Sequence, residues 1–143
     1  MSWNYKIIDH TADIAFDVEA DELNELFIAS AQVWRESISD DMVAAASEEK
    51  SLEINEESLE VLLVSFLSEL NYFFQSESWI MNSVRTIEII KECNEWHLRA
   101  KVLGSHFDRK KVKLKAEIKA ITYHQMEIKE QQGKFSTRVV FDI

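Results

Sequence analysis

The chain has 143 residues, a formal net charge of −10 and a single cysteine, and it is 46% hydrophobic and 29% charged. This length and composition predict one globular domain, spanning residues 1–143. The acidic balance argues against general nucleic-acid binding, because neutralising phosphates requires an excess of lysine and arginine. A single cysteine excludes an intramolecular disulfide and favours a reducing compartment.

Targeting and membrane signals are not evident in the sequence. No apolar run approaches the roughly 20 residues that a membrane-spanning helix needs. The first ten residues lack a basic region followed by an apolar stretch, which a secretion signal would contain. We therefore expect a cytoplasmic protein with no contact to a membrane.

The charge is distributed unevenly along the chain. Residues 1–82 hold 18 acidic and 3 basic residues, a net charge of −15, whereas residues 83–143 hold 8 acidic and 13 basic residues, a net charge of +5. One interpretation is an acidic surface with one lysine-rich segment. The other is that the two halves meet different partners, or different parts of one partner.

The first half of the chain predicts two short strands, an amphipathic helix, a strand and a second amphipathic helix. Apolar residues recur at helical spacing in both helices and alternate with polar residues in the strands. Asp21 is the expected N-cap of the first helix. The expected elements cover, in order, residues 5–8, 14–19, 22–38, 51–55 and 59–74.

From Trp79 onward the hydrophobic period changes to two, which is typical of strands. Hairpin turns are expected at residues 93–95 and 131–134. The expected strands cover residues 84–92, 96–103, 111–116, whose pattern continues over 122–130, and 135–143. The sequence therefore predicts an α+β fold: a mainly antiparallel β-sheet with two amphipathic helices packed on it, in the order β-β-α-β-α-β-β-β-β.

Two carboxylates and an imidazole crowd into the loop Asp9-His10-Thr11-Ala12-Asp13. The simpler interpretation is a turn whose aspartates accept backbone N–H groups. The alternative is a cation site, which would need a further carboxylate from elsewhere. Asp142 is a candidate, on the polar side of a C-terminal strand whose apolar face includes Phe141 and Ile143. Because the chain ends on this apolar pattern, we expect its last residues to be packed in place.

One basic cluster lies between residues 109 and 119. It is either a solvated sheet face that protects an edge, or a strip that faces phosphates or RNA. In the second case Phe107, Tyr123 and His124 could stack on bases. The cluster consists of Arg109, Lys110, Lys111, Lys113, Lys115 and Lys119.

Common catalytic motifs are missing from the sequence. Two glycines cannot form a glycine-rich phosphate loop, and there is no Cys/His zinc spacing, no H-E-x-x-H pattern and no G-x-S-x-G elbow. The acidic neighbours of Cys93 disfavour its thiolate, so we do not assign it a catalytic role.

Three segments together resemble the archease family. The first, Asp9 to Ile14, is similar to the family's D-H-T-A-D-[IV] signature. The second, Glu117 to His124, is similar to its E-[VI]-K-A-[IV]-T-Y-H motif, and the third is the ending Val140-Phe141-Asp142-Ile143. The helical stretch Phe66-Leu67-Ser68-Glu69-Leu70 also resembles the family's W-L-N-E-L-L. The resemblance spans essentially the whole chain.

The resemblance implies an accessory protein rather than an enzyme. Archeases activate the RtcB-type RNA ligase of tRNA splicing and RNA repair by promoting its guanylylation and its repeated turnover. The implied metal ligands are Asp13, Asp142 and the main-chain oxygen of Ile143, for a divalent ion such as calcium, with magnesium and manganese as alternatives. The ligase would be the direct partner, and RNA would be reached only through it. The residues implied to face the partner or its nucleotide are His10, Asp108, Lys119 and His124.

The sequence departs from the family pattern after Gly104. The family's G-E-x-x-D loop appears as Gly104-Ser105-His106-Phe107-Asp108, with Ser105 where glutamate is usual, and the histidine that often follows is absent. Two other functions remain open from the residues themselves. One is a metal-dependent hydrolase or nucleotide-processing enzyme that uses the same carboxylates, with His10 as acid or base. The other is a plain interaction domain whose acidic half docks on a basic partner.

Overall fold

The structure is a computed structural model that describes residues 3–9, 13–40, 48–123 and 126–143. The predicted α+β class is confirmed, and all paired strands in the described residues are antiparallel. The elements are, in order, β1 (Trp3–Asp9), β2 (Asp13–Ala20), α1 (Leu23–Ile38), β3 (Glu48–Glu56), α2 (Leu59–Glu77), β4 (Trp79–Glu92), β5 (Glu95–His106), β6 (Ala120–Thr122), β7 (Lys129–Gln131) and β8 (Lys134–Asp142).

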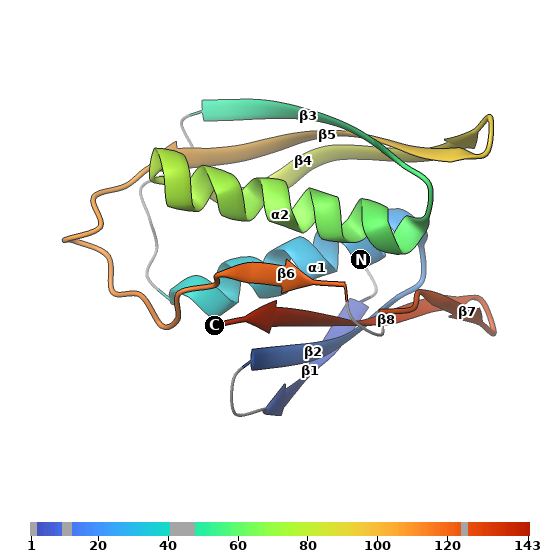
Figure 1. The fold of residues 1–143 in the computed structure, drawn as a ribbon, viewed down its shortest axis with the longest axis horizontal. Helices are drawn as coiled ribbons and strands as arrows, with labels where there is room; N and C mark the ends of the chain where they lie inside the picture. The colour runs from blue at the N-terminus through green and yellow to red at the C-terminus, as the bar shows by residue number, and fades with distance from the viewer. Residues whose placement is uncertain (1–2, 10–12, 41–47, 124–125) are drawn as a thin grey trace.

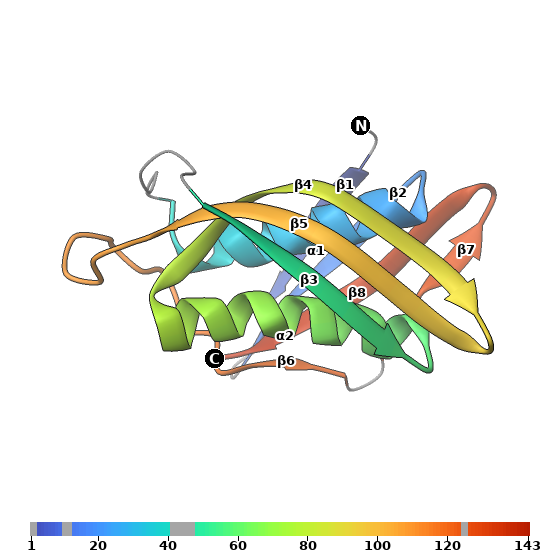
Figure 2. The same ribbon diagram turned by 90° about the horizontal axis from the view of Figure 1, so that it is seen from above.

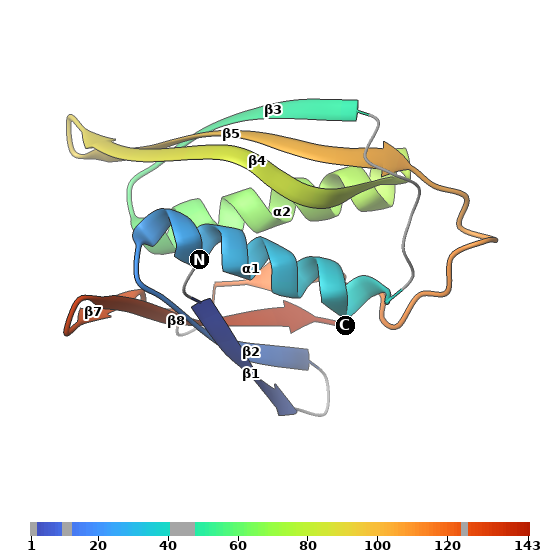
Figure 3. The same cartoon turned by 180° about the vertical axis from the view of Figure 1, so that it is seen from behind.

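The described strands divide between two sheets with both helices between them, whereas the sequence pattern suggested a single sheet. One sheet has the order β1-β2-β8-β6, with β7 also paired to β8, and the other has the order β3-β5-β4. Figure 1 shows the helices as a middle layer, and the view from behind in Figure 3 agrees. Figure 2 shows β3, β4 and β5 crossing over the helices. The outer face of the β1-β2-β8-β6 sheet is not covered by either helix.

The middle position explains why apolar residues extend round much of each helix. Between two sheets, a helix must bury side chains on opposite sides. In α1 the fully buried side chains include Leu26, Phe27 and Trp34, and in α2 they include Leu62 and Phe66. Among the described residues, no helix is both long and apolar enough to cross a membrane.

The start of α1 differs in detail from the sequence pattern, whereas α2 begins at Leu59 as expected. Asp21 is not the N-cap of α1, because the cap position falls on Glu22, whose side chain accepts no capping hydrogen bond. In α2 the hydroxyl of Ser58 does cap the helix, accepting a hydrogen bond from the N–H of Val61 at 3.2 Å. Such a hydroxyl satisfies one of the N–H groups that a helix start leaves unpaired.

Both predicted hairpin turns are present. Cys93 and Asn94, with φ of 53° and 64°, join β4 to β5, and Gln132 and Gly133, with φ of 53° and 76°, join β7 to β8. Two successive residues of positive φ form the tight turn whose twist matches that of the flanking strands.

The expected strand at residues 111–116 is wrong. This segment lies between β5 and β6 and forms no strand ladder. Its side chains alternate between exposed and partly buried because the segment runs against the C-terminal end of α1. The hydroxyl of Ser39 donates to the carbonyl of Lys113 at 2.6 Å, and the N–H of Lys115 donates to the carbonyl of Ile38 at 2.7 Å. An extended segment packed on a helix end shows the period of a strand without its pairing.

The expected strand at residues 122–130 is also divided. β6 ends at Thr122 and β7 begins at Lys129. Both short strands pair with β8, so β8 is flanked by β2 on one side and by β6 and β7 on the other.

A buried polar link fixes the entry into β6. The indole N–H of Trp34 in α1 donates to the side-chain oxygen of Asn71 in α2 at 3.1 Å. The amide nitrogens of Asn71 and Gln75 both donate to the carbonyl of Ile118, at 3.0 and 2.7 Å. Hydrogen bonds buried in this way strongly disfavour other placements, since any displacement would leave polar groups unpaired. Both helices therefore hold the chain where it reaches Lys119 and β6.

Candidate metal centre

Asp13 and Asp142 meet at one end of the β1-β2-β8-β6 sheet. Asp13 begins β2, Asp142 ends β8, and the antiparallel register pairs them directly. The next pair, Ile14 and Phe141, is on the helix-facing side, and Phe141 is fully buried. Because successive side chains alternate between faces, both aspartates are on the outer face. Directly opposed residues in such a ladder have Cβ atoms roughly 4.5–5.5 Å apart.

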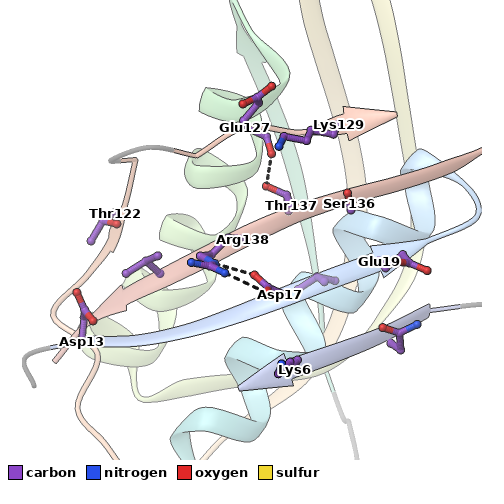
Figure 4. Close-up of a pocket in the computed structure, with 13 residues that line it drawn as sticks. Lys6, Asp13, Asp17, Glu19, Thr122, Glu127, Lys129, Ser136, Thr137 and Arg138 are labelled. Atoms are coloured by element: carbon purple, nitrogen blue, oxygen red, sulfur yellow. Dashed lines mark hydrogen bonds and ion pairs between the residues drawn. The ribbon is translucent and has the colours of Figure 1, made fainter. Parts of the chain in front are cut away.

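One oxygen of the Asp13 carboxylate is an unsatisfied hydrogen-bond acceptor. This atom, Oδ1, is buried and finds no hydrogen-bond partner among the residues that the structure describes. Figure 4 shows Asp13 at the start of β2, beside the end of β8. A buried carboxylate oxygen without a donor is costly unless a cation or an ordered water compensates it.

Asp142 lies between two strands. The same residue that pairs with Asp13 of β2 pairs with Ala120 of β6 on its other side. Its carbonyl accepts a hydrogen bond from the N–H of Lys119 at 2.7 Å. The register therefore brings Lys119, one of the residues expected to face the partner, next to the aspartate pair.

The candidate ligand atoms at this end of the sheet fit a hard divalent cation, because they are oxygen atoms, which calcium and magnesium prefer. Among the described residues, no group of three or more His, Cys, Asp or Glu side chains could hold a metal. A cation here would be held by Asp13 and Asp142, with the remaining ligands from main-chain oxygen, such as that of Ile143, and water.

Ile143 is less packed than the sequence pattern predicted. Its exposed fraction is 37%, whereas that of Phe141 is 0%. The apolar face of β8 therefore ends at Phe141, which packs against Phe16 with ring centroids 5.7 Å apart. The exposure of Ile143 is compatible with a role for the C-terminal main chain as a ligand.

A groove runs from Asp13 along the outer face of this sheet (Figure 4). Its volume is about 810 Å³, and its lining includes Lys6, Asp17, Thr122 and Arg138. The guanidinium of Arg138 donates two hydrogen bonds to the carboxylate of Asp17, at 2.7 and 3.2 Å. The groove therefore combines one satisfied ion pair with the unsatisfied carboxylate oxygen of Asp13.

The electrostatics of Asp17 are set mainly by its basic neighbours. The hydrogen bonds from Arg138 hold the pKa of Asp17 below its ordinary value, against an opposing effect of burial, and the charges of Arg138 and Lys6 lower it further. Asp17 is thus held ionised by neighbouring cations. The sequence analysis did not predict the Asp17–Arg138 ion pair. A signal was present, because charged residues occur four positions apart in each strand, at 13 and 17 in β2 and at 138 and 142 in β8. An even spacing keeps both residues of each strand on one face.

The remaining predicted site residues divide into two groups. His10 and His124 lie outside the described residues. Asp108 is exposed in the loop after β5, where its carboxylate accepts the N–H of Lys110 at 2.9 Å. It thus stabilises a turn, and the register that joins Asp13 to Asp142 does not involve it.

The region around Gly104 has a packing role. A Cβ atom at Gly104 would overlap the carbonyl oxygen of Ile80 and would lie 2.6 Å from the ring of Trp79. Ser105, where the family motif has glutamate, pairs with Ile80 and is 3% exposed. This segment of the motif therefore lies in the β4–β5 ladder, away from solvent.

Comparison with known proteins agrees with the motifs. The sequence model of the archease protein family (MTH1598/TM1083) matches residues 5–143. The chain is 33% identical to Protein archease of Methanosarcina barkeri over 139 residues, covering 97% of this chain and 95% of that protein. It is 35% identical to Protein archease of Pyrococcus furiosus over 136 residues, covering 94% and 95%.

Solved structures share the fold. The solution structure of protein 1598 of Methanobacterium thermoautotrophicum has a TM-score of 0.81 and 27% sequence identity, over 97% of this chain and 98% of that one. An archease from Thermotoga maritima, described as a possible chaperone, has a TM-score of 0.60 and 26% identity, over 96% of both chains. Since the family's sequence pattern extends over nearly the whole chain, this protein belongs to the archease family.

Proposed function

We propose that this protein is a metal-binding accessory protein that activates an RtcB-type RNA ligase, in tRNA splicing or RNA repair. It promotes guanylylation of the ligase and restores it for repeated turnover, and it acts in the cytoplasm. Membership of the archease family supports an accessory role. The observation that carries the metal part of the proposal is the register pair Asp13–Asp142, with one buried Asp13 oxygen that lacks a donor among the described residues.

In this proposal Asp13, Asp142 and the main-chain oxygen of Ile143 hold a divalent cation, calcium first, with magnesium or manganese as alternatives. The bound cation supplies concentrated positive charge at the end of the sheet. The chain's own contribution is to fix the two carboxylates: the β2–β8 ladder sets their separation, and Lys119 fixes the main chain of Asp142 through the bond to its carbonyl. Two carboxylates held in this way would otherwise repel each other.

The charge of the chain is suited to a protein partner. The net charge of −15 over residues 1–82 repels RNA phosphates, but it attracts a basic protein surface over a Debye length of about 10 Å at 0.1 M salt. A ligase that holds RNA and a guanine nucleotide must itself present positive charge. We therefore expect stimulation of the ligase to weaken as salt rises.

The test is ligation by a matched RtcB-type ligase under single- and multiple-turnover conditions, with and without this protein. The proposal predicts that the protein alone changes neither GTP nor RNA, and that the ligase with this protein completes more turnovers than the ligase alone. A ligase whose rate and turnover number are the same in both cases would refute it. Turnover of GTP or RNA by this chain alone would support the metal-dependent hydrolase instead.

A further inference from the structure

One segment of this acidic protein is strongly basic. Residues 107–119, here called the basic arm, hold six basic and two acidic residues within a chain of net charge −10. The arm connects β5 to β6 and extends from the body of the molecule at the end where the C-terminus lies (Figures 1 and 3). The backbone N–H of its last residue, Lys119, donates a hydrogen bond to the carbonyl of Asp142.

Two cations of the basic arm are used to anchor it. The guanidinium of Arg109 donates to the carbonyls of Phe74 and Gln75, at 2.7 and 3.0 Å, at the C-terminal end of α2. The ammonium of Lys115 donates to the carbonyl of Glu36, at the end of α1, and to the carboxylate of Asp40. Helix C-termini carry unpaired carbonyls and partial negative charge, so cations are stabilising there.

Two other cations of the arm lie in a turn and are exposed. Lys110 and Lys111 follow Asp108 in a tight turn, in which the N–H of Lys111 donates to the carbonyl of Asp108 at 2.9 Å. Both lysines are exposed, and neither ammonium has an ion-pair partner in the part of the chain that the structure describes. Because Arg109 precedes them and is anchored to α2, their position is set by the fold.

Phe107 begins the arm and Tyr123 follows β6, and the two aromatic residues differ in their exposure. Phe107 stacks on Phe74, with ring centroids 5.1 Å apart, so it is not available to a ligand. Tyr123, which follows β6, has an exposed fraction of 56%. Since β6 separates Tyr123 from the arm, the ligand contacts that the arm itself offers are its exposed lysines.

We propose that the basic arm binds the backbone phosphates of single-stranded RNA through Lys110 and Lys111. The inference rests on the proposed function only in its choice of RNA as the anionic ligand. Arg109 and Lys115 position the two lysines and do not contact the RNA. The acidic remainder of the surface keeps the binding weak for the free protein, so that the arm engages RNA mainly when a partner holds it nearby.

The test measures RNA binding directly, without the ligase. A short single-stranded RNA is titrated into labelled full-length protein at low salt, and backbone amide shifts are followed by NMR. Shifts concentrated in residues 107–119 are expected. The variant Lys110→Gln/Lys111→Gln should bind RNA more weakly. The steepness of its plot of the logarithm of the association constant against the logarithm of salt concentration should decrease by about 1–2, roughly one for each lost phosphate contact.

A matched control removes the same charge elsewhere. Lys91→Gln/Lys101→Gln alters two lysines of β4 and β5, and its salt slope should stay close to that of the wild type. An unchanged slope for the Lys110/Lys111 variant, or absence of RNA binding by the wild type at low salt, would overturn the inference. Shifts of the arm with an acidic peptide but not with RNA would also overturn it, and would identify a protein-docking site. Because the ligase is absent, a failure of ligase stimulation would count against the proposed function alone.

Discussion

Asp13 and Asp142, 129 positions apart in the sequence, are direct cross-strand partners in the β2–β8 ladder. Their side chains share the outer face of the sheet, and one oxygen of Asp13 is buried with no hydrogen-bond donor among the described residues. Two like charges held directly opposite each other in a ladder are destabilising. Such an arrangement is expected where a cation compensates the charge.

The first prediction follows from this repulsion. In chelator, Asp13→Asn should raise the free energy of unfolding by about 0.2–1 kcal/mol, because it removes one of two opposed charges. With excess calcium the order should reverse, because a bound cation stabilises only the wild type. Thermal unfolding with and without calcium measures both effects. Glu19→Gln, on the same strand face, should show no such reversal, and a destabilised Asp13→Asn in chelator would indicate a structural aspartate.

The second prediction concerns the C-terminal strand. Phe141 is fully buried against Phe16, so Phe141→Ala should lower the free energy of unfolding by about 3–5 kcal/mol. Ile143 is 37% exposed, so Ile143→Ala should cost less than about 1 kcal/mol. Urea unfolding of the two variants in chelator gives the comparison. Equal losses would mean that the packing of β8 extends to the last residue.

The two glycines should respond differently to alanine. At Gly104 the added Cβ would lie 2.6 Å from the ring of Trp79 and would overlap the backbone of Ile80, so we expect a loss of about 1–3 kcal/mol or more. At Gly133 nothing lies within 4 Å of the added atom, but φ is +76°, which costs an L-residue about 1 kcal/mol. Melting temperatures of the two variants distinguish a packing requirement from a conformational one. A Gly104→Ala variant as stable as Gly133→Ala would contradict the close contact.

The fourth prediction is a pH dependence. Because hydrogen bonds from Arg138 lower the pKa of Asp17 in the folded protein, the ionised carboxylate favours folding above the unfolded value of about 3.9. This stabilisation is lost as the pH falls through the folded-state pKa. Asp17→Asn should therefore lower the urea midpoint at neutral pH, and the difference from wild type should shrink in acid. Arg138→Gln should give the same trend, and a difference that grows in acid would exclude this assignment.

Periodicity predicted both helices and most of the strands, because amphipathic faces depend on local spacing. It failed at residues 111–116, since alternation records which side chains face the protein and does not record whether the backbone pairs with a strand. It also gave no sign that the strands divide into two sheets, because that depends on which apolar faces meet. Hydrogen bonds between distant segments, such as that from Asn71 to the carbonyl of Ile118, then fix where the chain enters β6.

The candidate site was predictable in part. The motifs around Asp13 and Asp142 indicated two carboxylates, but only the β2–β8 register places them opposite each other. The division of the basic residues could not be predicted from charge alone. Arg109 and Lys110 are neighbours in the sequence, yet Arg109 is hydrogen-bonded to the C-terminal end of α2 and Lys110 is exposed at a turn.

The role of the Asp13–Asp142 pair in activation can be measured as the rate at which a matched RtcB-type ligase is guanylylated from labelled GTP in a single turnover. The wild-type protein should accelerate this step, Asp13→Asn and Asp142→Asn should remove the acceleration while remaining folded, and Glu19→Gln should retain it. Acceleration by Asp13→Asn equal to that of the wild type would show that the Asp13–Asp142 pair does not carry the activity.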